Sequence, residues 1–260
     1  MSLRTKLNAL KSLWAFDNRY QLLLSRVFFR RNSLNVYVLQ EKEILIDHSS
    51  GDAVGVRETI TSRMYKQFLP HMNLPTSVNV LDIGANGGGF PLLLQLNHIK
   101  IKKLVCIEFN PNTYQRLKFN IVRNIQCDFI GMNVACCGAP KEYDVFLGRG
   151  GTSDSLYTSY QGEGGKVYSV TGMTLDEIYV RTFKQESGDI CKIDIEGAEY
   201  EIFDSPHHAS IANFRYLIIE IHSIPNRNKL ELIKKIENCG FSRLSKDPEE
   251  DVFLFHNIRI

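Results

Sequence analysis

The sequence predicts an α/β fold built on one open sheet of mainly parallel strands. From residue 78 onward, short apolar runs alternate with stretches of helical periodicity, which is typical of a parallel sheet with right-handed crossovers. The first of these apolar runs ends in a glycine-rich turn, residues 84–89, that opens a helix. The chain has 260 residues, which is enough for one large domain with a full core.

The elements of the main part of the chain follow in a regular order. We expect strands at 78–83, 104–109, 129–135, 190–195 and 216–221. We expect helices from residue 91, at 113–124, from Thr174, at 198–203 and at 229–238. Thr174 and Glu177 have the spacing of a capping box, and Gly240 can end the last helix. Two short strands flank the Gly/Ser-rich loop 148–165, and residues 241–244 and 252–255 close the chain as a hairpin.

Residues 1–77 are predicted to form an N-terminal extension, and residues 78–260 the main domain. The extension is expected to hold a helix over 1–31 with a break at Asp17-Asn18, one or two strands within 34–48, and a helix over 57–69 closed by Pro70. The first helix is apolar along one side and basic at its end. We favour packing against the body of the protein, or against a second copy in a homodimer, over peripheral contact with a membrane.

Composition excludes several classes of protein. Hydrophobic residues make up 43% and charged residues 23% of the chain, as in a globular domain. The formal net charge is +2 without a long Lys/Arg tract, so we expect no nucleic-acid partner. The six cysteines form no Cys-x-x-Cys pair, which indicates reduced, buried thiols rather than a zinc site. No apolar run approaches the roughly 20 residues of a membrane span and no signal peptide is evident, so we expect a cytoplasmic protein.

The glycine-rich turn indicates which kind of nucleoside-containing ligand the domain binds. A dinucleotide-binding turn would read G-x-G-x-x-G, whereas Asn86 takes the middle glycine position here. An acid, Asp82, stands at the end of the preceding strand. S-adenosylmethionine carries an ammonium and a sulfonium but no phosphate, so a carboxylate at this place suits it better than a diphosphate. We expect Asp82, Gly84, Asn86 and Gly87 to bind this cofactor.

A second acid, Glu108, ends the next strand of the predicted sheet. An acid at this place can accept hydrogen bonds from both ribose hydroxyls of a nucleoside. We therefore include Glu108 in the cofactor site, together with Phe109, Asn110 and Asn133. The alternative is a structural turn with a solvated Glu108.

Several segments combine into a more specific pattern. They are residues 80–89, 108–111, 120–121, 151–156, 174–178, 192–199 (Lys-Ile-Asp-Ile-Glu-Gly-Ala-Glu) and 219–222. At these segments, and over about residues 78–240, the chain resembles the FkbM-type family of S-adenosylmethionine-dependent methyltransferases. The resemblance implies a Rossmann-like class I methyltransferase fold, with a seven-stranded sheet whose last strand is antiparallel. It also implies O-methylation, commonly of sugars or of polyketide-type hydroxyls.

Four polar side chains are expected beside the methyl-donor end of the cofactor. Asp194 and Glu196 lie at the end of the fourth predicted strand, and Glu220 and His222 at the end of the fifth. Ligands of open α/β sheets bind at the carboxyl ends of the strands. Because side chains alternate along an extended segment, the two members of each pair should face the same way.

Two mechanisms of acceptor activation stay open for Asp194, Glu220 and His222, which we take as the catalytic residues. In one, these three side chains bind a divalent cation, Mg²⁺ or Mn²⁺, that lowers the pKa of the acceptor hydroxyl. In the other, which we favour, His222 or Asp194 is a metal-free general base. Asp194 is also expected to contact the cofactor. A different interpretation makes Lys192, Asp194 and Glu199 a buried ion-pair lattice that fixes the sheet.

The acceptor is expected to be a hydroxyl of a sugar, a glycan or a related small metabolite. Ser155, Tyr157 and Glu196 are the predicted substrate-binding residues. Tyr157, Tyr160 and Tyr168 around the Gly/Ser-rich loop could stack on sugar faces. The alternatives are methylation of nucleic acid or protein, and a catalytically silent binding protein that keeps the fold.

Overall fold

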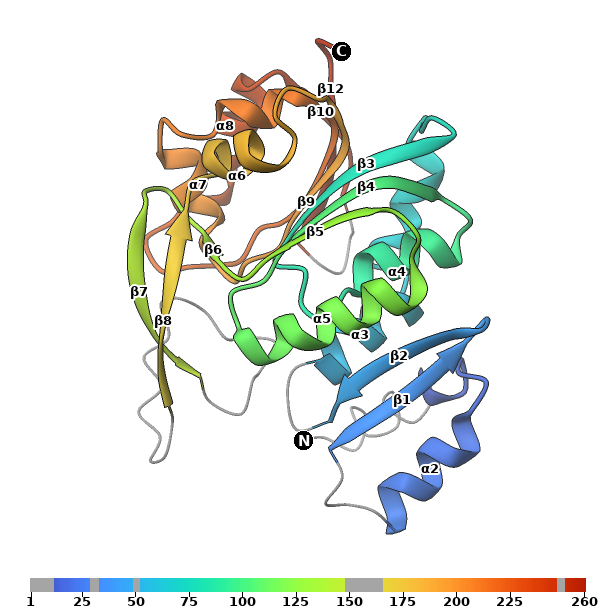
Figure 1. Cartoon of the computed structure of the whole chain (residues 1–260). Helices are drawn as coiled ribbons and strands as arrows, with labels where there is room; N and C mark the ends of the chain where they lie inside the picture. Colours follow the sequence, from blue (N-terminus) through green and yellow to red (C-terminus); the bar gives the residue numbers. More distant parts are fainter. Residues whose placement is uncertain (1–11, 29–32, 49–51, 148–165, 247–250) are drawn as a thin grey trace.

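A seven-stranded sheet forms the centre of the protein in the computed structural model, which describes residues 12–28, 33–48, 52–147, 166–246 and 251–260 (Figure 1). Its strands are β3 (Ser77–Ile83), β4 (Lys100–Ile107), β5 (Asp128–Met132), β9 (Gly188–Ile193), β10 (Phe214–Glu220), β11 (Phe241–Lys246) and β12 (Val252–Asn257). The order is β11-β12-β10-β9-β3-β4-β5. The strands from β5 to β10 are parallel, and β12 is antiparallel to both of its neighbours. The predicted sheet, with its antiparallel last strand, is confirmed.

Helices cover both faces of this sheet (Figure 1). One face carries α3 (Asp52–Thr61), α4 (Gly89–Leu96) and α5 (Pro111–Asn124), and the other carries α6 (Leu175–Thr182), α7 (Glu199–Asp204) and α8 (Lys229–Asn238). The central strands are apolar on both sides: Val80 belongs to the core under α4, and its neighbour Leu81 to the core on the opposite face. Such two-sided burial is typical of parallel sheets.

Several helix ends lie where the sequence predicts them. The hydroxyl of Thr174 accepts from the backbone N–H of Glu177, and the Glu177 carboxylate accepts from the backbone N–H of Thr174, so the capping box is present. Helix α8 has the predicted bounds, and Gly240 follows it with a φ of +99°. The third predicted strand is too long: β5 ends at Met132, and β6 (Ala135–Cys136) belongs to a second sheet with β7 (Lys141–Leu147) and β8 (Lys166–Met173).

The predicted helix over 57–69 is wrong in both of its bounds. Helix α3 begins at Asp52 and ends at Thr61, and a 3-10 turn, η1 (Lys66–His71), follows with Pro70 inside it. The hydroxyl of Ser62 accepts a hydrogen bond from the backbone N–H of Met64 at 3.2 Å. This local bond offers the backbone an alternative to a further helical turn, which periodicity alone does not reveal.

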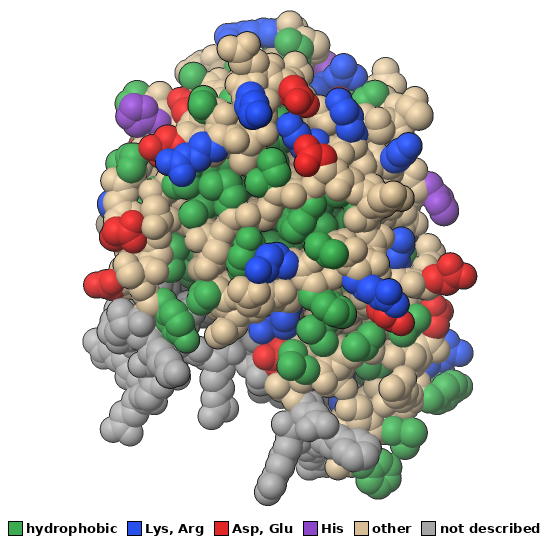
Figure 2. Space-filling model, viewed as in Figure 1, with side chains coloured by type: hydrophobic (Ala, Val, Ile, Leu, Met, Phe, Trp, Pro, Cys, Tyr) green, Lys and Arg blue, Asp and Glu red, His purple; other side chains and the backbone are tan. Residues whose placement is uncertain are grey.

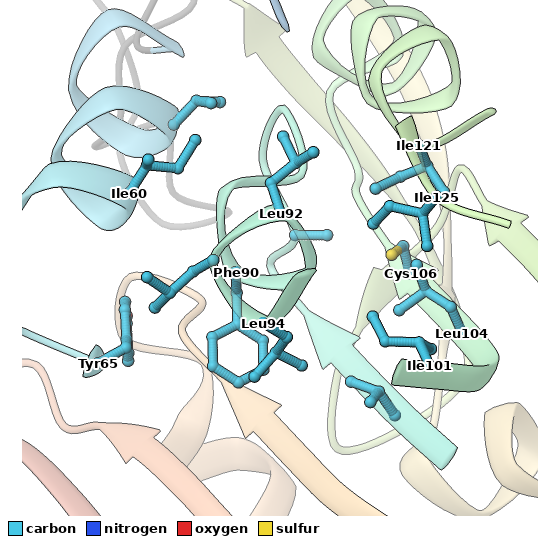
Figure 3. Packing of buried hydrophobic residues seen from close by; sticks show 14 of the residues in the cluster. Ile60, Tyr65, Phe90, Leu92, Leu94, Ile101, Leu104, Cys106, Ile121 and Ile125 are labelled. Carbon is cyan, nitrogen blue, oxygen red and sulfur yellow. The ribbon is translucent and has the colours of Figure 1, made fainter. Parts of the chain in front are cut away.

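The N-terminal extension and the sheet share one hydrophobic core. Within the described residues, the extension contains α2 (Arg19–Phe28), β1 (Leu34–Leu39) and β2 (Lys42–Asp47) before α3. Buried side chains of the extension, among them Phe16, Ile44, Val56 and Phe68, belong to the same cluster as Val80 and Leu104 of the sheet. Figure 3 shows part of this core, with Ile60 on the side of α3 and Phe90 and Leu92 on α4. The boundary predicted at residue 77 therefore divides the sequence but not the core.

Helix α2 buries one side and exposes another. Leu22 is fully buried, whereas Tyr20, Leu24, Val27 and Phe28 are each more than half exposed. Apolar side chains are visible at the lower right of Figure 2, over the end of the molecule that holds α2. The membrane contact considered for this helix stays a prediction. Within the described residues, no helix combines the length and the apolar character that crossing a bilayer requires.

All six cysteines have free thiols.

Asn120 of α5 joins the extension to the glycine-rich turn. Its side chain accepts from the backbone N–H of Leu45 in β2 at 2.7 Å, and donates to the carbonyl oxygens of Leu45 at 3.0 Å and Gly87 at 2.8 Å. The side chain is fully buried. A buried amide with three partners fixes β2 and the turn relative to each other.

Asn120→Ala should lower the free energy of unfolding by about 2–4 kcal/mol, because it leaves buried backbone groups without partners. Urea unfolding followed by circular dichroism measures this change. Asn112→Ala, at an exposed position of the same helix, should change the stability by less than about 0.5 kcal/mol. Equal stabilities of the two variants would contradict the role given to Asn120.

Candidate active site

A cavity of about 260 Å³ lies at the carboxyl ends of β3, β4, β9 and β10. This edge includes the boundary between β3 and β9, where the chain order of the strands reverses and open α/β sheets bind their ligands. Its wall contains Gly84, Ala85 and Asn86 after β3, Glu108, Phe109 and Asn110 after β4, and Asp194, Glu196 and Glu220 after or at the ends of β9 and β10. Many of the side chains chosen from the sequence thus share one cavity.

Gly84 allows β3 and β9 to approach each other closely at the cavity wall. Its φ is +76°, in the left-handed region that favours glycine. A Cβ at this position would lie 1.7 Å from the backbone oxygen of Asp194, so a larger residue would force the two strand ends apart. Asn86 also has a positive φ, +49°, and its Oδ1 accepts from the backbone N–H of Gly87 at 2.7 Å. The turn therefore presents backbone to the cavity in a fixed shape.

Glu108 is held by the turns on either side of it. Its two carboxylate oxygens accept from the backbone N–H of Asn86 at 3.0 Å and of Asn110 at 2.8 Å. The Asn133 amide donates to the carbonyl oxygens of Glu108 at 2.8 Å and Phe109 at 2.9 Å, and so supports this turn without lining the cavity. A carboxylate oxygen has two acceptor positions and can accept more than one hydrogen bond.

Asp82 lies behind the cavity wall, unlike the sequence-based expectation, and Gly87 does not line the cavity either. The Asp82 carboxylate is fully buried and lies 3.2 Å from Nζ of Lys192. Burial raises the pKa of Asp82, and the charge of Lys192 opposes that shift. For Lys192, burial lowers the pKa, but the charges of Asp82 and Asp194 outweigh burial and raise it. The charge of Asp82 is therefore already matched by Lys192, and its side chain is not part of the cavity wall.

The ion-pair interpretation is present in part. Nζ of Lys192 also lies 3.5 Å from Oδ2 of Asp194 and donates to the carbonyl oxygen of Gly84 at 3.3 Å. Glu199 does not join these contacts. It is fully buried, and its Oε1 lies 2.8 Å from Nδ1 of His222. Its predicted place in the lattice is wrong, because Glu199 holds the imidazole ring instead.

His222 lies among four carboxylates. Nδ1 contacts Glu199, and Nε2 lies 3.4 Å from Glu196, 3.6 Å from Glu220 and 4.0 Å from Asp194. The predicted reason for this convergence fails for Glu196, which is not extended but has a φ of +52°. Glu196 nevertheless reaches His222, because the turn after β9 folds back toward β10.

The protonation of His222 and Glu220 follows from these contacts. Burial would lower the pKa of His222, but the hydrogen bond and charge of Glu199 and the charges of the other acids raise it to about 9. At neutral pH the ring is therefore a cation and has no free lone pair, which argues against His222 as a general base in this state. Burial and the charge of Asp194 raise the pKa of Glu220 to about 7. A group with this pKa can accept a proton near neutral pH.

The same cluster contains a set of side chains with metal-ligand chemistry. One ligand atom from each of Asp194, Glu220 and His222 lies within 4.8 Å of the other two. Two carboxylates and an imidazole suit Mn²⁺ better than Mg²⁺, which prefers oxygen ligands alone. The arrangement is thus compatible with the predicted metal site, and it disfavours His222 as the base of the predicted metal-free mechanism.

One wall of the cavity comes from the N-terminal extension, which the sequence analysis did not include in the site. Gly55, Glu58, Thr59, Met64 and Tyr65 line it. A Cβ at Gly55 would lie 2.8 Å from the Asn86 side chain, so α3 packs directly on the glycine-rich turn. The predicted helix begins at residue 57, so Gly55 lies outside it and gave no signal for this wall.

The predicted acceptor loop lies outside the described residues. Ser155, Tyr157 and Tyr160 fall in the segment 148–165. Tyr168 lies in β8, where it packs against Ala135 and Val170. The stacking of Tyr168 on a sugar stays a prediction.

Comparison with solved structures gives distant similarities. A structure titled methyltransferase FkbM from Methylobacillus flagellatus KT has a TM-score of 0.47 and 14% identity, over 75% of this chain and 47% of that one. This chain thus corresponds to about half of that protein. The structure of M. capricolum TrmK with S-adenosylhomocysteine has a TM-score of 0.43 and 14% identity, over 76% of this chain and 70% of that one. At these values neither similarity carries an argument about function, and no curated protein matches the sequence.

Comparison with protein families gives a firmer result. Residues 82–243 match the methyltransferase FkbM domain. The matched part runs from the buried Asp82 through the cavity edge to β11, and it covers more than half of the chain. The chain therefore belongs to the FkbM methyltransferase family.

Proposed function

We propose that the protein transfers a methyl group from S-adenosylmethionine to a hydroxyl of a sugar, a glycan or a related small metabolite. One observation carries the proposal: the acids Asp194 and Glu220 share a cavity with the glycine turn and Glu108. A neutral alcohol is a weak nucleophile and must lose its proton as it attacks, so an O-methyltransferase needs a proton acceptor beside the methyl donor.

Two features of the cavity wall support the proposed cofactor. Gly84 is a position where a side chain would clash, and it leaves the backbone bare beside the cavity. Glu108, fixed by two backbone N–H groups, would accept from the ribose hydroxyls. Asp194 and Glu220 would lie toward the sulfonium end. When bound, the cofactor supplies an electrophilic methyl group with a thioether leaving group.

We propose Glu220 as the residue that accepts the proton of the hydroxyl. It lines the cavity, whereas His222 does not. The cation on His222 and the buried Lys192 would hold the neighbouring carboxylates in place. A divalent cation bound by Asp194, Glu220 and His222 is the second way to activate the hydroxyl, and it gives His222 the role of a neutral ligand.

The charges around the cavity favour an acceptor without phosphate. Five acids line it, Glu58, Glu108, Asp194, Glu196 and Glu220, and Lys192 is the one Lys or Arg among the described lining residues. That lysine is already paired with Asp82 and Asp194. Nucleic acid, which we consider as the alternative acceptor, would bring phosphates toward an acidic wall.

Methyl transfer from isotope-labelled S-adenosylmethionine should appear in neutral glycans or monosaccharides when the purified protein is tested against a panel of acceptors. Sugar phosphates and transfer RNA in the same panel should take up at least about tenfold less label, because of the acidic wall. Mass spectrometry locates the methyl group on oxygen. Label in transfer RNA alone would refute the proposed acceptor class.

Glu108→Gln should weaken the binding of S-adenosylmethionine by about tenfold or more, because hydrogen bonds to a charged group are worth about 1.5–3 kcal/mol. Isothermal titration calorimetry measures the dissociation constant. Glu231→Gln, at an exposed position of α8, should leave it unchanged. If both variants bind as tightly as the unmodified protein, Glu108 does not hold the cofactor.

The rate of methyl transfer should fall as the pH is lowered through about 7, because Glu220 accepts a proton only when ionised and its pKa is raised to about 7. Glu220→Gln should lose this limb of the pH profile and at least about a hundredfold in rate. Initial rates between pH 5.5 and 8 measure both effects.

Dialysis against a chelator separates the two mechanisms of activation. The metal-free mechanism predicts an unchanged rate after dialysis. A rate that collapses and returns with Mn²⁺ would assign Glu220 to a metal site rather than to a free base.

A further inference from the structure

Tyr65 lies in the turn between α3 and η1, outside the part of the chain that matches the methyltransferase domain. It is 1% exposed, and its ring packs edge-on against Phe90 of α4 with 5.7 Å between the ring centroids. Figure 3 shows the two rings next to each other. Tyr65 also lines the cavity. A side chain from the N-terminal extension thus reaches the centre of the site.

The hydroxyl of Tyr65 meets the two carboxylates proposed above for the methyl-donor end. It donates to Oδ2 of Asp194 at 2.9 Å and lies 3.4 Å from Oε2 of Glu220. Burial and the charges of Asp194 and Glu220 raise the pKa of Tyr65 well above its ordinary value. The phenol therefore keeps its proton and stays a donor throughout the working pH range.

Tyr65 and Lys192 compete for the same oxygen of Asp194. Nζ of Lys192 lies 3.5 Å from Oδ2, the atom that accepts from Tyr65. The ammonium also lies 5.4 Å from the centre of the Tyr65 ring, within the range of a cation–π contact. The bond to the neutral phenol is the shorter of the two, so Tyr65 holds the Asp194 carboxylate while its ion pair with Lys192 stays at the longer distance.

We propose that Tyr65 is a positioning residue of the methyltransferase, whose hydroxyl keeps the Asp194 carboxylate directed at the cavity and available to a positively charged sulfur. The inference rests on the proposed placement of the sulfonium beside Asp194. It makes the N-terminal extension a working part of the site rather than an appendage. A charge held in this way favours S-adenosylmethionine over S-adenosylhomocysteine, which lacks the sulfonium charge.

Tyr65→Phe tests this role, because it removes only the hydroxyl and keeps the ring against Phe90 and Lys192. Isothermal titration with S-adenosylmethionine and with S-adenosylhomocysteine gives the ratio of the two affinities. We expect the affinity for S-adenosylmethionine to fall about tenfold and that for S-adenosylhomocysteine to change by less than about twofold, as Asp194 turns toward Lys192.

Tyr216→Phe is the matched control. Tyr216 is equally buried, in β10, and its hydroxyl accepts from the backbone N–H of Asn73 at 2.8 Å, away from the cavity. Tyr216→Phe should leave the ratio of the affinities for the two ligands unchanged. It should lower the melting temperature by about as much as Tyr65→Phe does.

Two results would overturn the role of Tyr65. One is that both affinities stay the same in Tyr65→Phe, and the other is that both fall by the same factor, which indicates a purely structural contribution; in either case the affinity ratio is unchanged. Failure of the cofactor site itself has a different signature, namely an unmodified protein that binds neither ligand. The affinity ratio thus separates the two hypotheses without requiring a known acceptor.

Discussion

The ammonium group of Lys192 lies buried between the carboxyl ends of β3 and β9, and the site is arranged around it. Asp82 and Asp194 pair with it, the carbonyl oxygen of Gly84 accepts from it, and the ring of Tyr65 covers it. A buried charge is tolerated only when it is paired, and losing one partner leaves the rest uncompensated. This constraint connects the glycine turn, the FkbM segment 192–199 and the N-terminal extension. Asp82 at the end of β3 is therefore part of the framework around Lys192. The other acid that pairs with this lysine, Asp194, lines the cavity.

Much of the fold follows from local patterns in the sequence. The strands of the parallel sheet are largely continuous apolar runs, and one helix after them begins at the cap that the sequence predicts, Thr174. These signals are short-range, so they survive without knowledge of the partner elements. The helix over 57–69 was misplaced because its bounds depend on a serine turn and on packing against α4, and neither leaves a periodic trace.

For the site, the sequence predicts only which residues the parallel strands bring to one edge of the sheet. Strand ends of a parallel sheet meet at one edge, which correctly brings Glu108, Asp194 and Glu220 to one cavity. Tyr65 lies 129 positions before Asp194 in the chain, and the spacing of the two residues does not predict their contact. Asp82 and Asp194 are both acids at strand ends, yet burial behind Lys192 gives the first a structural task. Sequence supplies the residue types, and only packing decides which of them faces a ligand.

An excess of negative charge then remains at the cavity, and it explains several features together. Lys192 and His222 are matched to carboxylates, and the acids still outnumber these two cations. Burial raises the pKa values of Glu196 and Glu220, and the charges of neighbouring acids raise them further. A site that holds like charges close together is less stable than it could be, and such costs are typical of functional sites. A bound sulfonium would relieve the repulsion. When methyl transfer converts it to a neutral thioether, the proton that Glu220 accepts would offset the lost charge, so the repulsion would return only after that proton leaves the site. The charge surplus that favours the methyl donor would therefore weaken the binding of the product once Glu220 has released its proton.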